Sequence, residues 1–255
     1  IKSILLSVMA IGLGIIFWGT VAQAQENIGT VLNDAPQGIT IDNYFTEGQG
    51  FKNSATKATT PYGKDQAIQL TDAGDQLGTI WTSNGAEMNL GEDETASMWL
   101  YFGNGNDSAG DGMAFVMQND KRGLSATSTK ADGTPDTGET LGVWGSDQRT
   151  DYTQKPDLSA VAKSAIQNSW ALEFDTFGQN RLTDVANLKK GIASQFDTDV
   201  PSGYPHIAAN YPGLVKSYGI GETDDTETTT TPATYFPIYI PGNSVTTTTP
   251  YYYVK

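Results

Sequence analysis

Two carboxylates lie two positions apart in the segment WALEFDTFGQN, residues 170–180. The segment is rich in bulky and aromatic residues, which are typical of a β-strand. Because alternate side chains of a strand share a face, Glu173, Asp175 and Phe177 are expected to point the same way. The opposite set, which can enter the core, is Leu172, Phe174 and Thr176. The strand therefore presents two acids on one of its surfaces.

Two interpretations of this acidic pair are open. Glu173 and Asp175 are expected to lie about 7 Å apart, where like charges repel unless water or a cation separates them. A solvated polar strand face is the ordinary explanation for two acids at this spacing. A calcium site is the alternative, because Ca²⁺ takes about six to eight oxygen ligands and carboxylates supply them.

Two further segments carry side chains that could bind a metal ion or a polar ligand. Upstream, in SAGDGMAFVMQND, Asp111 lies between two glycines at a tight turn into an apolar strand. Downstream, in FDTDVPSGYPHIAANYPG, Asp197 and Asp199 precede His206, the sole histidine of the chain. Taken alone, the aspartate is ordinary turn chemistry and the histidine an ordinary surface or core residue.

Taken together, these segments resemble a known family. GDGMAFVMQND, WALEFDTFGQN and HIAANYPG occur in this order, with LGVWG between the first two. The set resembles the L-type lectins, the legume-lectin or concanavalin-like family, and in particular its secreted bacterial branch. The resemblance covers residues 38–221. It implies an all-β jelly-roll sandwich of two antiparallel sheets with a calcium-organised carbohydrate site at one edge.

The resemblance also implies a set of metal ligands. Asp175 corresponds to the central calcium ligand, Phe177 offers its carbonyl and Asn180 its side-chain amide. Asn180 lies one residue later than the family pattern, so Gln179 is the alternative. Asp199 is the first choice for the acid contributed by the following loop. The alternatives for that acid are Asp197 and Asp184.

Glu173 and His206 resemble the ligands of the family's second ion, a transition metal such as Mn²⁺. The loop between EFDTF and HIA is much longer here than in the family. Bacterial members can lack this second ion, so calcium is the cofactor that the resemblance implies first.

The resemblance assigns sugar-binding roles as well. Asp111 corresponds to the carboxylate that accepts hydrogen bonds from two adjacent sugar hydroxyls. Gly138 or Gly142 is expected to donate a backbone N–H to the same sugar, and Asn180 completes the carbohydrate set. The family pattern also implies a cis peptide bond between Gly110 and Asp111. Glycans or glycoproteins are the expected partners.

Two other functions compete with a lectin. Laminarinase-type glycosidases use the same sandwich with the motif Glu-x-Asp-x-x-Glu, and retaining hydrolysis needs its two carboxylates about 5 to 5.5 Å apart. Starting from Glu173 and Asp175, the second glutamate of that motif is replaced by Gly178. We therefore do not expect an enzyme. The other competitor is a structural or adhesive spacer that binds no saccharide.

Composition limits the class of protein further. The 255 residues include 29 acidic and 15 basic side chains, for a formal charge of −14. Nucleic acid is therefore not an expected partner, because phosphate binding needs Lys and Arg. Cysteine is absent, which excludes disulfides and thiolate chemistry. Abundant Gly, Thr and Tyr without a long helical period favour an all-β protein.

The ends of the chain suggest processing and further structure. Lys2 followed by an apolar run and Ala22-Gln23-Ala24 predicts a signal peptide cleaved before Gln25, with an uncleaved membrane anchor as the rival. We expect no membrane insertion of the mature chain, a secreted or cell-surface location, and a sequence that is incomplete at both ends. The expected parts are 1–24 signal peptide, 25–37 N-terminal lead-in, 38–221 lectin-like domain, and 222–255 Thr-rich segment with the start of further strands.

Between the ends, short apolar runs bounded by Gly, Asn, Asp or Pro predict strands. Residues 158–166, LSAVAKSAI, are expected to form one short helix or a surface loop. The predicted strands are 66–71, 77–82, 96–103, 112–119, 141–145, 169–177 and 206–210.

Overall fold

The structure is a computed structural model of the 255-residue chain. It describes residues 28–42, 44–82, 85–103, 110–146, 157–176, 206–214 and 252–254. Within these ranges the chain is mostly β, with few and short helices, so the expected all-β class is confirmed at this level. The expected signal peptide, residues 1–24, and most of the Thr-rich segment, residues 222–255, lie outside the described residues.

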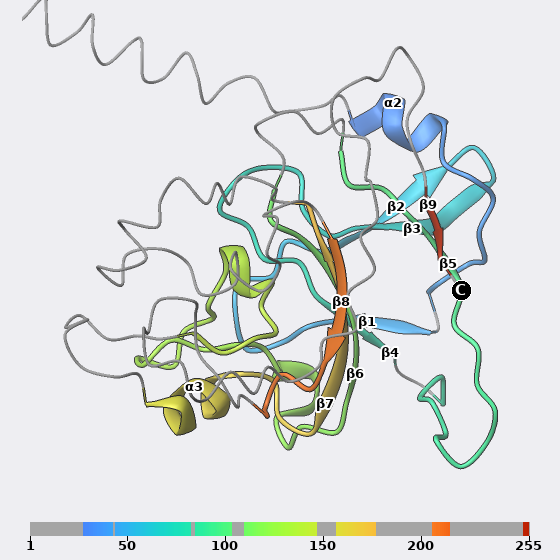
Figure 1. The fold of residues 1–255 in the computed structure, drawn as a ribbon. Helices are drawn as coiled ribbons and strands as arrows, with labels where there is room; N and C mark the ends of the chain where they lie inside the picture. The colour runs from blue at the N-terminus through green and yellow to red at the C-terminus, as the bar shows by residue number, and fades with distance from the viewer. Residues whose placement is uncertain are drawn as a thin grey trace, which may run out of the picture.

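The described strands form four small antiparallel sheets (Figure 1). Three of them are two-stranded and pair β1 with β4, β2 with β3, and β5 with β9. The fourth is three-stranded in the order β6-β7-β8 and holds most of the residues singled out by the sequence. The strands are β1 Phe45–Glu47, β2 Thr56–Thr60, β3 Gly63–Gln69, β4 Ile80–Thr82, β5 Met98–Leu100, β6 Gly112–Gln118, β7 Ser169–Asp175, β8 His206–Asn210 and β9 Tyr252–Val254.

Two α-helices and two 3₁₀ turns complete the described elements. They are α2 Ile28–Asn33, η1 Gly123–Ser125, η2 Gly138–Thr140 and α3 Leu158–Ser164. Helix α3 begins where Asp157 accepts hydrogen bonds from the N–H groups of Ser159 and Ala160, the usual role of aspartate before a helix. The sequence left a helix or a loop open for this stretch, and the structure shows the helix.

Most predicted strands are confirmed in position, although several are shorter than expected. Strand β8 matches 206–210, and β6 and β7 nearly fill their predicted ranges. The prediction of a strand at 141–145 is wrong. This stretch is a turn in which Leu141 and Gly142 have φ of 48° and 70°, left-handed values that a strand does not contain. Its apolar residues reflect burial instead, because Val143 and Trp144 belong to the core.

The three-stranded sheet has two chemically different faces, as strand alternation requires. We call one the acidic face, and it carries Gly112, Ala114, Val116, Ala171, Glu173, Asp175 and Asn210. We call the other the apolar face, and it carries Met113, Phe115, Met117, Trp170, Leu172, Phe174 and Ile207. Of the residues expected to enter the core, Phe174 is buried, and its ring centroid lies 5.9 Å from that of Phe102, whereas Leu172 and Thr176 are only partly buried.

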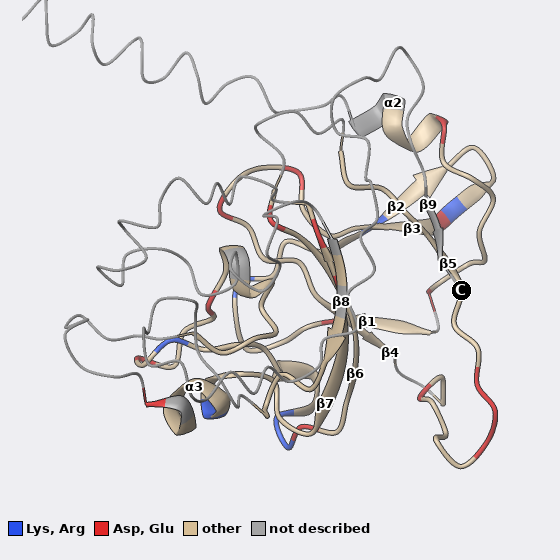
Figure 2. Cartoon of the chain, viewed as in Figure 1, with Lys and Arg blue, Asp and Glu red and all other residues tan. Residues whose placement is uncertain are grey.

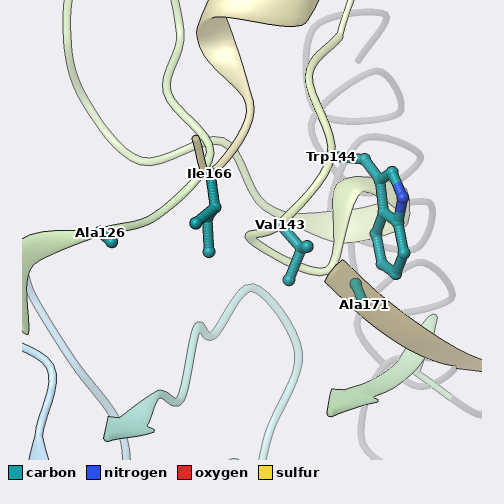
Figure 3. Close-up of a cluster of buried hydrophobic side chains, with 5 residues drawn as sticks. All are labelled: Ala126, Val143, Trp144, Ile166 and Ala171. Carbon is teal, nitrogen blue, oxygen red and sulfur yellow. The ribbon is translucent and has the colours of Figure 1, made fainter. Parts of the chain in front are cut away.

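The buried core lies against the acidic face (Figure 3). Its members come from the 126–146 segment, from the end of the α3 connection and from β7. Ala114 and Val116 of β6 are partly buried against the same cluster. The cluster is Ala126, Val143, Trp144, Ile166 and Ala171. A long irregular segment is thus packed onto this sheet as a covering layer.

In the view of Figure 1, the three-stranded sheet stands near the middle, with α3 on the left and the β2–β3 and β5–β9 pairs on the right. The described structure does not by itself establish the two-sheet jelly roll expected from the resemblance. It does show that the first and last described segments of the chain both join the β structure. Helix α2 contacts β2 and contributes the buried Val31, and β9 pairs with β5.

Acidic residues, coloured red in Figure 2, are spread over several loops of the described chain. The few described ion pairs include Arg122 with Asp120 and Lys57 with Asp42. Within the described residues, no helix has the length and apolar character needed to cross a bilayer.

Candidate functional site

The two carboxylates of β7 are buried rather than solvated. Glu173 is 6% exposed and Asp175 is 8% exposed. The interpretation of this pair as an ordinary solvated strand face is therefore wrong. Burying carboxylates is costly unless they are paired, hydrogen-bonded or bound to a metal, so the structure gives these two side chains a specific environment.

The register of the sheet places small residues and the single histidine beside these acids. Glu173 is paired with Ala114 of β6 and Asp175 with Gly112. On the other side, the backbone of Asp175 is paired with that of His206 at the start of β8. The sheet thus brings 173, 175 and 206, three of the six predicted metal residues, into two neighbouring strands.

The other predicted metal residues lie outside the described residues. These are Phe177, Asn180 and Asp199, together with the alternatives Asp184, Asp197 and Gln179. Among the residues that the structure describes, no three His, Cys, Asp or Glu side chains are grouped closely enough to hold a metal ion. The described chain therefore supplies two buried carboxylates at the expected place, and the proposed calcium and Mn²⁺ sites stay predictions.

Asp111 lies at the same end of the sheet, immediately before β6. Its carbonyl accepts a hydrogen bond of 3.1 Å from the N–H of Thr176, and the Thr176 hydroxyl donates to the Gly110 carbonyl at 2.6 Å. These two bonds extend the pairing of β6 and β7 by one residue on each strand. They fix the backbone of Asp111 beside the end of the strand that carries Asp175.

The turn at Asp111 depends on the glycine that follows it. Gly112 has a φ of 140°, and a Cβ on this residue would lie 2.1 Å from the carbonyl oxygen of Phe174. A side chain there would collide with the backbone of β7. Glycine is therefore required where β6 approaches β7 so closely, and this close approach sets the direction in which Asp111 leaves the sheet.

The structure brings Asp111 together with Gly138, the first of the two glycines predicted to bind sugar. A Cβ on Gly138 would lie 3.9 Å from Oδ2 of Asp111, and Gly138 is exposed. Gly142 is buried instead, and its N–H donates to the Thr140 hydroxyl at 3.2 Å. Of the two glycines, Gly138 is therefore the one that is exposed and lies beside Asp111.

The carboxyl group of Asp111 is chemically distinct from a surface aspartate. Partial burial removes water from its charged form and raises its pKa above the ordinary 3.8, although a hydrogen bond from its own backbone N–H opposes this change. A half-buried acceptor beside exposed backbone is suited to bind a polar, uncharged ligand through hydroxyl groups.

One feature expected from the resemblance is wrong. The described residues contain no cis peptide bond, so the bond between Gly110 and Asp111 is trans. A trans bond is the ordinary state, because the cis form of a non-proline peptide costs about 2.5–4 kcal/mol. The arrangement of Asp111 thus differs in this respect from the family pattern.

Two residues of the site region were not predicted from the sequence. The indole Nε1 of Trp144 donates a 2.7 Å hydrogen bond to Oδ1 of Asn210, the last residue of β8. Both residues occur in segments used for the resemblance, LGVWG and HIAAN, but there they signalled only strands. The polar bond between them could not be read from either segment alone.

No family model, no curated protein and no solved structure matches this chain in sequence or structure comparison. The resemblance to L-type lectins therefore depends on the sequence segments alone.

Proposed function

We propose that this chain is a calcium-dependent carbohydrate-binding domain of a secreted or cell-surface protein, acting in glycan recognition or adhesion. The observation that carries the proposal is the placement of Asp111 beside Gly138 at the end of a sheet whose central strand holds buried Glu173 and Asp175. Separate parts of the sequence supply these residues, and the fold collects them at one sheet end.

The chemistry of such a site follows from its groups. The Asp111 carboxylate accepts hydrogen bonds from two adjacent hydroxyls of a sugar, and the backbone of exposed Gly138 donates an N–H to the same ring. Asp175 would hold calcium together with oxygens from the segment after β7, and the ion would supply the charge that keeps these groups together. Charge-assisted hydrogen bonds to the carboxylate are stronger than neutral ones, so Asp111 dominates binding.

We propose further that the whole domain is a jelly-roll sandwich. The apolar face of the three-stranded sheet supports this, because such a face needs a second layer to cover it. The contact of Phe102 with Phe174 places the chain just after β5 against that face. Strand β5 in turn pairs with β9 from the other end of the sequence.

A glycan array probed with residues 25–255, with and without calcium, tests the proposed function. We expect calcium-dependent binding to a defined set of glycans and its loss in Asp111→Asn. The matched control is Asp42→Asn, which removes an exposed acid that pairs with Lys57. Calcium binding without any glycan binding would favour the spacer alternative, and cleavage of a bound glycan would favour a hydrolase.

A further inference from the structure

The segment 138–146, which we call the site loop, extends over the acidic face of the three-stranded sheet. At one end, Gly138 lies beside Asp111. At the other end, Trp144 packs in one cluster with Ala171 of β7 (Figure 3). Ala171 precedes Asp175 by four strand residues, a distance of about 13 Å along β7. The site loop therefore runs along the same face that carries the two buried acids.

The site loop contains one residue, Leu141, whose backbone conformation is unfavourable for its side chain. Gly138, Leu141 and Gly142 have φ of 77°, 48° and 70°. Left-handed geometry is easy for glycine but costs a residue with a side chain about 1–2 kcal/mol. Leu141 keeps this conformation only because surrounding contacts hold it. The position of Gly138 thus depends on the contacts that hold the rest of the site loop in place.

Several hydrogen bonds fix it, including one of 2.9 Å from the N–H of Ile166 to the Val143 carbonyl. From the neighbouring 126–128 segment, the buried Ser128 donates its N–H to the Gly142 carbonyl at 2.6 Å and its hydroxyl to the Trp144 carbonyl at 2.5 Å. From the sheet, Asn210 accepts the 2.7 Å bond from the Trp144 indole. Most of these hydrogen bonds join the loop to other irregular segments, and among them the bond of Trp144 to Asn210 is the one that joins it to a strand.

We infer that Trp144 and Asn210 are positioning residues of the saccharide site, which hold Gly138 at the correct place beside Asp111 through the indole-to-amide hydrogen bond. This inference rests on the proposed carbohydrate-binding function. The bond is buried on the tryptophan side, since Trp144 is 6% exposed, so losing either partner leaves a polar group without its hydrogen bond. The site loop then shifts while the sheet and its carboxylates stay in place.

Three variants test the bond. Trp144→Phe removes the N–H donor, Asn210→Leu removes the acceptor, and the double variant removes both polar groups. Each single variant should weaken glycan binding about tenfold, the equivalent of one hydrogen bond. The double variant should weaken it no further than the singles, because the two residues act through one contact. Calcium affinity should be unchanged in all three.

Stability is controlled by Val31→Ala, which removes buried volume in helix α2, far along the chain from the site loop. It should lower the melting temperature without changing glycan affinity. Hydrogen exchange supplies a second measurement that needs no ligand. The amides of Leu141, Val143 and Trp144 donate to carbonyls within the site loop, and their exchange should accelerate in the single variants while the amides of β6 and β7 stay protected.

The outcomes separate this inference from the proposed function. Wild-type protein that binds no glycan with calcium present overturns both. If the wild type binds glycan and the exchange of the site loop is unchanged in Trp144→Phe and Asn210→Leu, the positioning role is wrong. It is equally wrong if exchange accelerates but glycan affinity stays at the wild-type value.

Discussion

At the scale of single residues, Asp111 should make glycan binding sensitive to mild acid. Burial raises its pKa above 3.8, so the carboxylate takes up a proton at a higher pH than an exposed aspartate does. The protonated form loses one acceptor and its charge, and affinity should fall as the pH decreases through this raised pKa. Titration calorimetry with saturating calcium at each pH measures the change.

Protonation of Asp111 should weaken glycan binding, but it should not lower the stability of the fold. A raised pKa means that the folded chain binds the proton more tightly than the unfolded chain, so protonation of Asp111 itself does not destabilise the fold. Circular dichroism recorded at each pH therefore separates loss of binding from unfolding. Affinity that stays constant to about pH 4 contradicts the role of Asp111.

A second residue, Asp120, has a structural role with a different pH dependence. Its buried side chain accepts hydrogen bonds from Arg122 and from the N–H of Gln167 at 2.7 Å. Arg122 also donates to the carbonyls of Thr127 and Ala165. Although burial raises the pKa of Asp120, these hydrogen bonds and the Arg122 charge outweigh it and leave the pKa below its usual value. The pair thus joins three segments next to the core.

Asp120→Asn should lower the free energy of unfolding by about 1–3 kcal/mol at pH 7, because it removes the buried carboxylate that accepts charge-assisted hydrogen bonds from the partly exposed Arg122. Since the pKa of Asp120 is lowered on folding, this contribution is complete above about pH 4 and is lost as the pH falls through the folded-state pKa. Urea unfolding at pH 7 and pH 3 measures the difference. Asp42→Asn, which breaks an exposed pair, should cost less than about 1 kcal/mol at either pH, and equal losses in both variants contradict the prediction.

At the scale of elements, the approach of β6 to β7 is set by Gly112. Gly112→Ala places a Cβ 2.1 Å from the Phe174 carbonyl oxygen at a φ of 140°, so the strands must separate locally. We expect a loss of about 1–3 kcal/mol in stability together with weaker glycan binding, because Asp111 moves with the strand end. Chemical unfolding and calorimetry check both effects.

Gly110→Ala is the matched control for stability. A Cβ on Gly110 meets no heavy atom within 4 Å and its φ is not in the left-handed region, so the change should alter stability by no more than about 0.5 kcal/mol. Comparable destabilisation by both substitutions means that the Gly112 contact is not what fixes the two strands.

The same elements show what could be predicted from the sequence. Strands β6, β7 and β8 were recognisable because runs such as GMAFVMQ and SWALEFD have strand propensity and end at turn residues. Strands β1 and β2, FTE and TKATT, were missed because they are short and polar, and their pairing partners lie elsewhere in the chain. LGVWG was mistaken for a strand because apolar residues report burial, not backbone conformation.

For the candidate site, the sequence showed the types of residue but not which of them lie close together. The acids were visible as residue types, and their roles came from a resemblance. The proximity of Asp111 to Gly138 and the bond of Trp144 to Asn210 involve residues far apart in the sequence, and no local pattern encodes such pairs. The trans bond before Asp111 shows that the resemblance did not predict this detail of the backbone.

At the scale of the whole molecule, the formal charge of −14 means that the negative charges of the folded chain repel one another. A bound cation should reduce this repulsion. Glu173 and Asp175 add two buried carboxylates to one strand, where their mutual repulsion is screened least. A calcium ion that binds only the folded state stabilises it by about 2.7 kcal/mol at a hundred times Kd. The melting temperature should therefore rise with calcium and fall again with chelator.

Asp175→Ala should abolish both this rise and glycan binding, because Asp175 is the proposed central ligand of the ion. Glu173→Ala should leave most of the rise in place if a single ion is bound, and it should remove part of it if a second ion such as Mn²⁺ is also held. Scanning calorimetry with calcium, with manganese and with chelator distinguishes these cases, and Asp42→Asn controls for the loss of an acid elsewhere. A melting temperature and glycan affinity that do not respond to chelator would show that the buried acids of β7 have a structural role without a metal.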